Sequence, residues 1–267
     1  MSEISAGLVK ELRELTGAGM MDCKRALQDT DGDLDAARTL LREKGMAQAG
    51  KRADRATTEG LVGSIADGGT GTIVGIGCET EPVSKSDEFQ AFAERVLRAV
   101  HERGVSATGA FDEERLELMG KLGENIVVAG VERVEDAGTI AAYIHPPANK
   151  IGVLVDLDGG DEVLARQLAM HISFAAPEWA TREDVSPEAI EAERQVYLNS
   201  DEVLSKPEAA REKIVTGMLG KRFFAASPGG VLVDQAWIHD QSKSVGAALE
   251  AAGATLKGFK RISVAGS

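Results

Sequence analysis

The sequence contains few cysteines and few aromatic residues, and no apolar run in it approaches the ~20 residues of a membrane span. Its two cysteines, Cys23 and Cys78, are far apart and form no Cys-x-x-Cys pair. This excludes a disulfide framework and favours a reduced, cytoplasmic setting. The chain start also lacks the basic segment followed by an apolar run that is typical of a signal peptide. We therefore expect a cytoplasmic protein that does not bind a membrane.

Positive charge is scarce as well. The chain has 30 Lys and Arg against 43 Asp and Glu, a formal net charge of −13, which repels a phosphate backbone unless the basic residues gather on one face. No basic run extends beyond Lys51-Arg52 with Arg55, so direct nucleic-acid binding is disfavoured. What the chain does have is aliphatic side chains. With 43% hydrophobic and only 4% aromatic residues, we expect about two or three compact units with aliphatic cores.

Residues that break bonds or hold metals do not cluster in the sequence. The histidines follow no His-x-His or His-x-x-x-His spacing, so we interpret them as surface, packing or interface residues: His101, His145, His171 and His239. Gly68-Gly69-Thr70-Gly71 lacks the Lys-Ser/Thr of a phosphate-binding loop and predicts a hairpin tip. Gly17-Ala18-Gly19 lies between predicted helices, which excludes a dinucleotide-binding turn. We expect no enzyme, no catalytic residue, no metal and no cofactor.

The first 45 residues predict three short helices. The apolar face of the first has helical spacing: Leu8, Leu12 and Leu15. The turn at 16–19 ends this helix, and the second runs from Met20 or Met21 to Leu27. Asp33 caps the third, which is expected to end at Lys44-Gly45. Residues 46–58 have no coherent apolar face, so they predict either a charged linker or a solvated helix extension.

From residue 59 the apolar period changes to that of mixed strands and helices. Strands are expected at 61–65, 72–78, 126–134, 139–144, 151–157, 231–238 and 256–264. Helices are expected at 87–100, 111–122, 161–175, 184–197, 207–224 and 242–252. A strand hairpin followed by a helix occurs twice, which indicates two related subdomains. The predicted fold is α+β, divided into a helical module with its linker (1–54), a first core subdomain (55–145) and a second (146–267) that contains a helical hairpin at about 184–224.

Two surface segments remain as candidates for function. Residues 16–27 combine a turn, two adjacent methionines and the basic pair Lys24-Arg25. They are either a docking face whose flexible Met side chains adapt to a partner, or a helix cap with core methionines. Residues 78–85 connect a strand to a helix. They are either a protruding loop on a rigid scaffold, or an ordinary connection in which Pro82 stops the strand and Ser84 or Ser86 caps the helix.

The run from Leu12 to Leu27, LRELTGAGMMDCKRAL, resembles the N-terminal signature of the elongation factor Ts family in residue types and spacing. Weaker matches follow in the family's order: Gly123–Ile126, Ile151–Val155, Ala169–Ile172, Gly220–Phe224 and Ser242–Gly246. The resemblance implies a ubiquitin-associated-like three-helix module and an α+β core of two subdomains. It also implies an inserted helical hairpin that is often used for dimerisation, which leaves monomer and homodimer both open.

The resemblance further implies a guanine nucleotide exchange factor that binds elongation factor Tu with GDP, disturbs its Mg²⁺ and phosphate site and promotes GDP release. The residues expected to hold the GTPase domain are Thr16, Gly17, Met20, Met21 and Lys24. Those expected to dislocate Mg²⁺ are Thr80, Glu81, Pro82 and Val83. A second domain of the partner is expected to touch His145, Ile238 and His239.

One motif departs from the family. Its second signature reads Cys-Gln/Glu-Thr-Asp-Phe-Val, and here the segment is Cys78-Glu79-Thr80-Glu81-Pro82-Val83. Pro82 cannot supply the aromatic ring that wedges into the GTPase, so we expect a weaker or differently shaped insertion, or a partner with a matching pocket. The alternative hypothesis is a ubiquitin-associated-type adaptor or an exchange-weak paralogue that binds the GTPase without efficient exchange.

Overall fold

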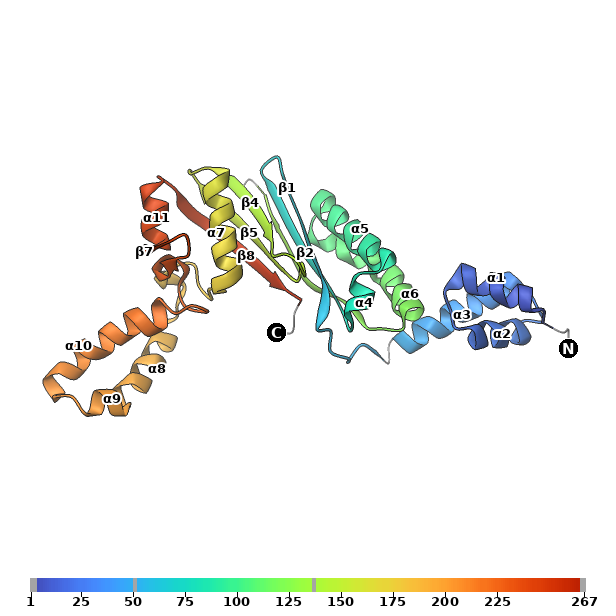
Figure 1. Ribbon diagram of the computed structural model, residues 1–267, viewed down its shortest axis with the longest axis horizontal. Coiled ribbons are helices and arrows are strands. Elements are labelled where there is room, and N and C mark those ends of the chain that lie inside the picture. Colours follow the sequence, from blue (N-terminus) through green and yellow to red (C-terminus); the bar gives the residue numbers. More distant parts are fainter. Residues whose placement is uncertain (1–3, 50–51, 136–137, 265–267) are drawn as a thin grey trace.

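The computed structural model describes residues 4–49, 52–135 and 138–264. Figure 1 shows an elongated molecule with a three-helix module at one end, two sheets covered by helices in the middle, and a helical hairpin at the other end. The α+β fold predicted from the sequence is confirmed.

The N-terminal module consists of α1 (Ala6–Thr16), α2 (Met20–Asp29) and α3 (Leu34–Ala49). The Asp33 carboxylate accepts the Ala36 N–H at 2.9 Å and so caps α3. Leu12, Cys23 and Leu27 are fully buried in the module's core.

Two predictions for this module are wrong. Leu15 does not belong to the buried face of α1, because it is 55% exposed, while Val9 is buried instead. Helix α3 does not end at Gly45 but continues to Ala49. The helix continues through Gly45, whose backbone lies against Gly120 of α6. The start of the segment 46–58 is therefore a helix extension.

The first sheet is antiparallel, in the order β1-β2-β3. Its strands are β1 (Glu59–Asp67), β2 (Thr70–Cys78) and β3 (Ile126–Val134). Between β2 and β3 the chain forms α4 (Glu81–Ser84), α5 (Asp87–Arg103), η2 (Val105–Phe111) and α6 (Asp112–Leu122). The apolar stripe of α5 packs against β2, with Phe89, Phe92 and Val96 fully buried.

The second sheet repeats this topology in the order β4-β5-β8. Its strands are β4 (Thr139–Ile144), β5 (Ile151–Asp158) and β8 (Thr255–Ser263). Helices α7 (Glu162–Ala175) and α11 (Val245–Ala251) contribute to its core. Because β4 pairs with β5, strand pairing favours a subdomain boundary between 134 and 139, whereas a boundary after 145 would leave β4 with the first subdomain.

The two sheets contact each other through small residues. A Cβ added at Gly75 or Gly130 would meet Ile262 of β8, and one at Gly152 would meet Val62 of β1. Side chains from both sheets form one cluster between them: Val62, Ile73, Leu154, Ile262 and Val264. Because of this close packing, the two subdomains form one continuous body.

In the sequence, the helical hairpin follows α7 and precedes the last strand, β8. It consists of η3 (Arg182–Asp184), α8 (Pro187–Leu198), α9 (Asp201–Leu204), α10 (Glu208–Met218) and the π-helix η4 (Leu219–Phe224). A cluster of its own that includes Val203, Val215 and Phe224 holds it together.

The strand expected at 231–238 is mostly absent. The segment forms η5 (Leu232–Asp234) and the short β6 (Ala236–Trp237), which pairs with β7 (Asp240–Ser244). The buried Gln235 side chain donates to the Ala226 and Gly229 carbonyls, and these bonds favour a tight turn over an extended strand. Helix α11 consequently starts at Val245 and not at the expected 242.

Candidate functional site

The turn between α1 and α2 is built by local hydrogen bonds. Gly17 ends α1 in the left-handed conformation, with φ 67°, and its N–H donates to the Arg13 carbonyl at 2.8 Å. The Thr16 hydroxyl donates to the Leu12 carbonyl at 2.7 Å and accepts the Ala18 N–H at 3.3 Å. The turn thus has its own internal support, and it presents the start of α2 on a preformed scaffold.

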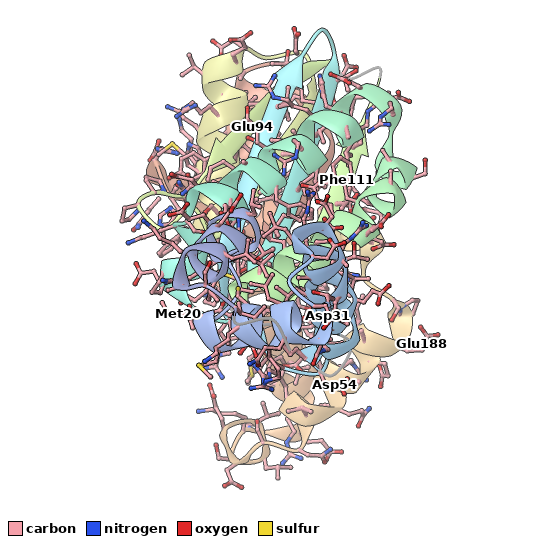
Figure 2. The ribbon with its side chains drawn as sticks, turned by 90° about the vertical axis from the view of Figure 1, so that its right-hand side faces the viewer. Met20, Asp31, Asp54, Glu94, Phe111 and Glu188 are labelled. Carbon is pink, nitrogen blue, oxygen red and sulfur yellow. The ribbon has the colours of Figure 1, made fainter. Side chains whose placement is uncertain are left out.

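Met20, Met21 and Lys24 project from the start of α2. The two methionine side chains are 57% and 64% exposed, and Figure 2 shows Met20 at the outer edge of the N-terminal module. Their interpretation as core methionines is therefore wrong. Within the part of the chain that the structure describes, the Lys24 ammonium forms no ion pair or hydrogen bond. This face offers adaptable apolar side chains and an unpaired cation.

The segment that follows β2 is one helical turn, α4, and not an open loop. Thr80 precedes it in an extended conformation, and Pro82 lies in its first turn, where a missing N–H costs no helical hydrogen bond. The Ser84 hydroxyl donates to the Glu81 carbonyl at 2.8 Å. Thr80, Glu81 and Pro82 are exposed, whereas Val83 packs against the first core. The next helix, α5, is capped by Ser86, one of the two candidates.

Charges around α4 are set by neighbours at both of its ends. The Lys85 ammonium lies 2.6 Å from Glu81 Oε1, and this bond lowers the pKa of the Glu81 carboxyl. Burial raises the pKa of the Cys78 thiol to about 12, and the Glu124 carboxylate adds to the effect. The thiol therefore stays neutral, and its Sγ donates to the Thr80 carbonyl at 3.3 Å.

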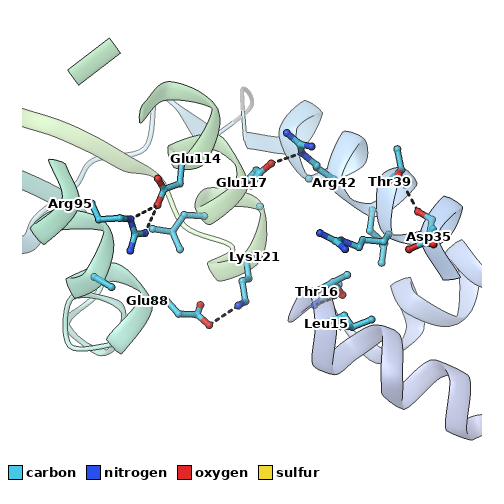
Figure 3. A pocket seen from close by; sticks show the side chains of 17 residues that line it. Leu15, Thr16, Asp35, Thr39, Arg42, Glu88, Arg95, Glu114, Glu117 and Lys121 are labelled. Atoms are coloured by element: carbon cyan, nitrogen blue, oxygen red, sulfur yellow. Dashed lines mark hydrogen bonds and ion pairs between the residues drawn. The ribbon is translucent and has the colours of Figure 1, made fainter. Parts of the chain in front are cut away.

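The end of α6 connects the α1–α2 turn to the first turn of α5, the helix that follows α4. A Cβ added to Gly17 would lie 2.5 Å from Lys121 Cε, so the Lys121 chain passes directly over the turn. The Lys121 ammonium pairs with Glu88, in the first turn of α5, at 2.6 Å. This pair lies beside a cleft of about 740 Å³ between the module and α5–α6. Figure 3 shows the pair, with Thr16 on the opposite wall of the cleft.

Helices α3 and α6 cross where two glycines meet. A Cβ added to Gly120 would lie 3.1 Å from Gly45 Cα, so these positions allow the two backbones to approach closely. Beside the crossing, Arg42 of α3 pairs with Glu113 and Glu117 of α6, the latter drawn in Figure 3. These pairs are half-exposed and contribute little on their own. Close backbone packing therefore sets how the module sits on the core.

The two histidines expected to form the second contact are connected to consecutive residues of α7. His145 follows β4, and its Nδ1 lies 3.2 Å from the Tyr143 hydroxyl, while the Arg166 guanidinium of α7 lies 5.9 Å from the Tyr143 ring centre. His239 Nε2 lies 3.2 Å from the carbonyl oxygen of Gln167, the next residue of α7. Both histidines are thus connected to neighbouring residues of α7, although they are distant from each other in the sequence.

Two features of this region were not predicted from the sequence. The first is a pair of exposed apolar side chains on α7. Phe174 of α7 is 75% exposed and Val163 is 64% exposed. Phe174 lies outside the apolar stripe formed by Leu164, Leu168 and Ile172, and this position is the signal that the sequence offered for an exposed aromatic side chain.

The second missed feature is His171, which is fully buried. Its Nδ1 accepts the Ile238 N–H at 3.3 Å, and its Nε2 lies 2.9 Å from Gln235 Oε1. Through this hydrogen bond His171 fixes the position of the Ile238 backbone. Residue spacing in the sequence does not reveal this role.

Acidic, histidine and cysteine side chains do not gather into groups of three or more that would suit a metal ion, within the residues that the structure describes. Among the same residues, no helix combines the length and the apolar character needed to cross a membrane. The exposed features of the site are instead apolar side chains and single charges on rigid elements, which is the composition of a protein-docking surface.

Comparison with known proteins agrees with this class. A sequence model of the family described as "Elongation factor TS" matches residues 79–266. The chain is 42% identical to elongation factor Ts of Alkalilimnicola ehrlichii, over 98% of this chain and 92% of that protein. It is 39% identical to the protein of the same name from Hydrogenovibrio crunogenus, over 98% and 91%, and 40% identical to that of Citrobacter koseri, over 99% and 92%. The chain belongs to the elongation factor Ts family, a family of translation elongation factors.

Proposed function

We propose that the chain is the guanine nucleotide exchange factor of translation elongation. It binds elongation factor Tu in the GDP-bound form, disturbs the Mg²⁺ and phosphate site, and promotes GDP release so that GTP can rebind. Its family supports this proposal. The observation that carries it is that Met20, Met21 and the tip Thr80–Pro82 are exposed, while the Lys121 side chain of α6 lies over the α1–α2 turn and pairs with Glu88 of α5, the helix that follows α4.

The mechanism needs binding energy and no covalent chemistry. A partner that prefers the nucleotide-free GTPase lowers GDP affinity by the same factor by which GDP lowers affinity for that partner. Each ~1.4 kcal/mol of preference changes the equilibrium tenfold. Two contacts held at a fixed separation supply such a preference if both fit only when the GTPase has opened its nucleotide site.

The residues have two proposed roles: some bind the GTPase domain, and others open its nucleotide site. Thr16 and Gly17 shape the turn, while Met20, Met21 and Lys24 bind the GTPase domain through apolar contact and a charge. Thr80, Glu81 and Pro82 form the tip that enters the Mg²⁺ side, and half-buried Val83 anchors it.

The α7 region makes the second contact. His145, Ile238 and His239 meet another domain of the partner, and Phe174, with 75% of its side chain exposed, adds apolar area that becomes buried on binding.

Release of a fluorescent GDP analogue from the matching elongation factor Tu tests the proposal. We expect the release rate to rise with the concentration of this protein and to saturate. Replacing Met21 and Lys24 by alanine is expected to raise the half-saturating concentration roughly tenfold or more. Lys10→Ala is the matched control, because Lys10 is an exposed lysine whose ion pair, among the described residues, is with Glu14 of the same helix.

The same experiment separates the alternatives. An adaptor or an exchange-weak paralogue would bind the GTPase while GDP left at its unassisted rate. Unchanged GDP release at saturating protein, with binding shown by calorimetry, would reject the exchange function and favour that alternative.

A further inference from the structure

The motif Gly123-Glu124-Asn125-Ile126 has no role in the surfaces described so far. It links α6 to β3, and Ile126 pairs with Cys78 in the last rung between β3 and β2. Beyond this rung the two strands are still joined, but by side chains. Their arrangement determines how α4 leaves the sheet.

The Glu124 carboxylate binds the entry to α4. Its Oε2 accepts the N–H groups of Glu79 and Thr80 at 3.1 and 3.0 Å, and its Oε1 accepts the Thr80 hydroxyl at 2.5 Å. Thr80 is the N-cap residue of α4, but its side chain makes no capping bond to the helix. The Thr80 hydroxyl therefore serves to attach α4 to residue 124. Hydrogen bonds to an ionised acceptor are the stronger kind.

Another hydrogen bond runs in the opposite direction, from the Gly123–Ile126 motif to Glu79. Glu79 Oε1 accepts the Asn125 N–H at 2.7 Å and lies 3.4 Å from Arg55 Nη1. The buried Asn125 amide, only 1% exposed, donates from Nδ2 to the Ala53 and Arg55 carbonyls at 3.1 and 2.8 Å. Residues 53–55 belong to the segment that connects the N-terminal module to β1. The motif thus joins the base of α4 to the chain that carries the module.

We propose that Glu124 and Asn125 are positioning residues for nucleotide exchange. Glu124 holds α4 so that Glu81 and Pro82 meet the partner in a preformed arrangement, and Asn125 fixes the connecting segment relative to the same point. Preorganisation of this kind removes an ordering cost at the moment of binding. The inference rests on the exchange function proposed above and names two residues that do not touch the GTPase.

The test is saturation kinetics of GDP release from elongation factor Tu with full-length Glu124→Ala. We expect the maximal release rate to fall roughly tenfold or more, because three charge-assisted bonds to Glu79 and Thr80, at the entry to α4, are lost. The half-saturating concentration should change less than about threefold, since Met20–Lys24 still binds. Hydrogen exchange of the amides at 79, 80, 84 and 85 should become faster in the variant. Glu94→Ala is the control, because Glu94 pairs with Arg98 within α5 and with no other residue that the structure describes.

Two further variants keep the test decisive if Glu124→Ala unfolds. Glu124→Gln retains a carbonyl acceptor and should restore part of the maximal rate. Thr80→Val removes only the hydroxyl bond at an exposed position and should lower the rate less than Glu124→Ala. A variant that is folded, exchanges its α4 amides faster and yet reaches the wild-type maximal rate would overturn the inference. Failure of the wild-type protein itself to release GDP would instead overturn the exchange function.

Discussion

Glu81 and Pro82 replace the Asp-Phe of the family signature that the segment resembles, and the structure shows how the proline fits. The proline fits the first turn of α4 without distorting it, and its ring is exposed. The tip is therefore intact in shape but carries less apolar area than a phenylalanine would. Burial of a Phe side chain is worth about 1.5–3 kcal/mol.

We predict that Pro82→Phe raises the maximal rate of GDP release from elongation factor Tu roughly tenfold. The larger ring would bury more apolar surface in the opened GTPase and leave the closed form unaffected. Stopped-flow release of fluorescent GDP measures this, with Pro82→Ala as the control for loss of the proline ring. An unchanged rate with Phe would mean that the tip of α4 is not the wedge, or that the partner has a pocket matched to proline.

His171 gives the molecule a defined response to pH. Burial lowers the pKa of its imidazole below the usual 6.5, and His239 adds to the shift, while the bond to Gln235 opposes it. Because Nδ1 accepts the Ile238 N–H, the neutral ring carries its proton on Nε2 and donates it to Gln235 Oε1.

A folded-state pKa below the unfolded value means that the unfolded chain binds more protons. The stabilising contribution of the neutral ring is present above pH ~6.5 and is lost as pH falls through the lower folded pKa. We predict that the free energy of unfolding falls less between pH 7.5 and 5 in His171→Leu than in the wild type, as measured by urea titration at about six pH values. His145→Gln, at an exposed histidine, should keep the wild-type dependence. Equal pH dependence in His171→Leu would exclude the buried ring as the source.

Among the elements, the crossing of α3 and α6 decides where the N-terminal module sits. The Cβ of any larger residue at 120 would lie 3.1 Å from Gly45 Cα and 3.2 Å from its carbonyl carbon. The neighbour is backbone, so the helices must separate.

We predict that Gly120→Val costs about 1–3 kcal/mol of stability by overpacking and also lowers the rate of GDP release at a fixed, subsaturating protein concentration. The reason is that displacement of α3 moves Met20–Lys24 relative to α4. Gly217→Val in α10 is the matched control, because a Cβ there meets no atom within 4 Å. If both variants released GDP equally fast, the crossing would not determine the spacing of the two contacts.

For the molecule as a whole, regular periodicity was enough to predict most of the fold. The strands 126–134 and 139–144 have the predicted bounds. The sequence failed where tertiary bonds override local pattern. The Gln235 side chain binds the Ala226 and Gly229 carbonyls and turns an apolar segment away from the sheet, and α3 continues through Gly45 where it packs against α6.

The site was predictable only in part. Exposed Met20, Met21 and Pro82 lie in segments that motifs identify. Glu124 and Asn125 act through contacts with residues 44 to 72 positions away, and no local spacing in a single sequence reports such distances. Phe174 is an aromatic residue off the buried stripe in the sequence, but only the structure shows that its side chain is 75% exposed.

The helical hairpin is the remaining surface with an expected partner, a second copy of the chain. A stable interface buries about 1,200–2,000 Å² and has an apolar centre. In the hairpin the large apolar side chains that are strongly exposed are Val196 and Leu204, at 62% and 48%. Charged pairs occupy much of the rest, such as Arg194 with Glu212 at 2.6 Å and Arg222 with Glu202 at 2.8 Å.

We therefore predict that a dimer formed through the hairpin is weak and dissociates at micromolar concentration, as weak, small interfaces do. Sedimentation velocity over a range of roughly 1–100 µM should show a mass that rises with concentration. Val196→Asp should shift the protein toward monomer, whereas Val163→Asp, an equally exposed valine on α7, should leave the mass unchanged. A dimer that persists at the lowest concentration and is broken only by Val196→Asp would show that the hairpin binds its copy through more than these two side chains.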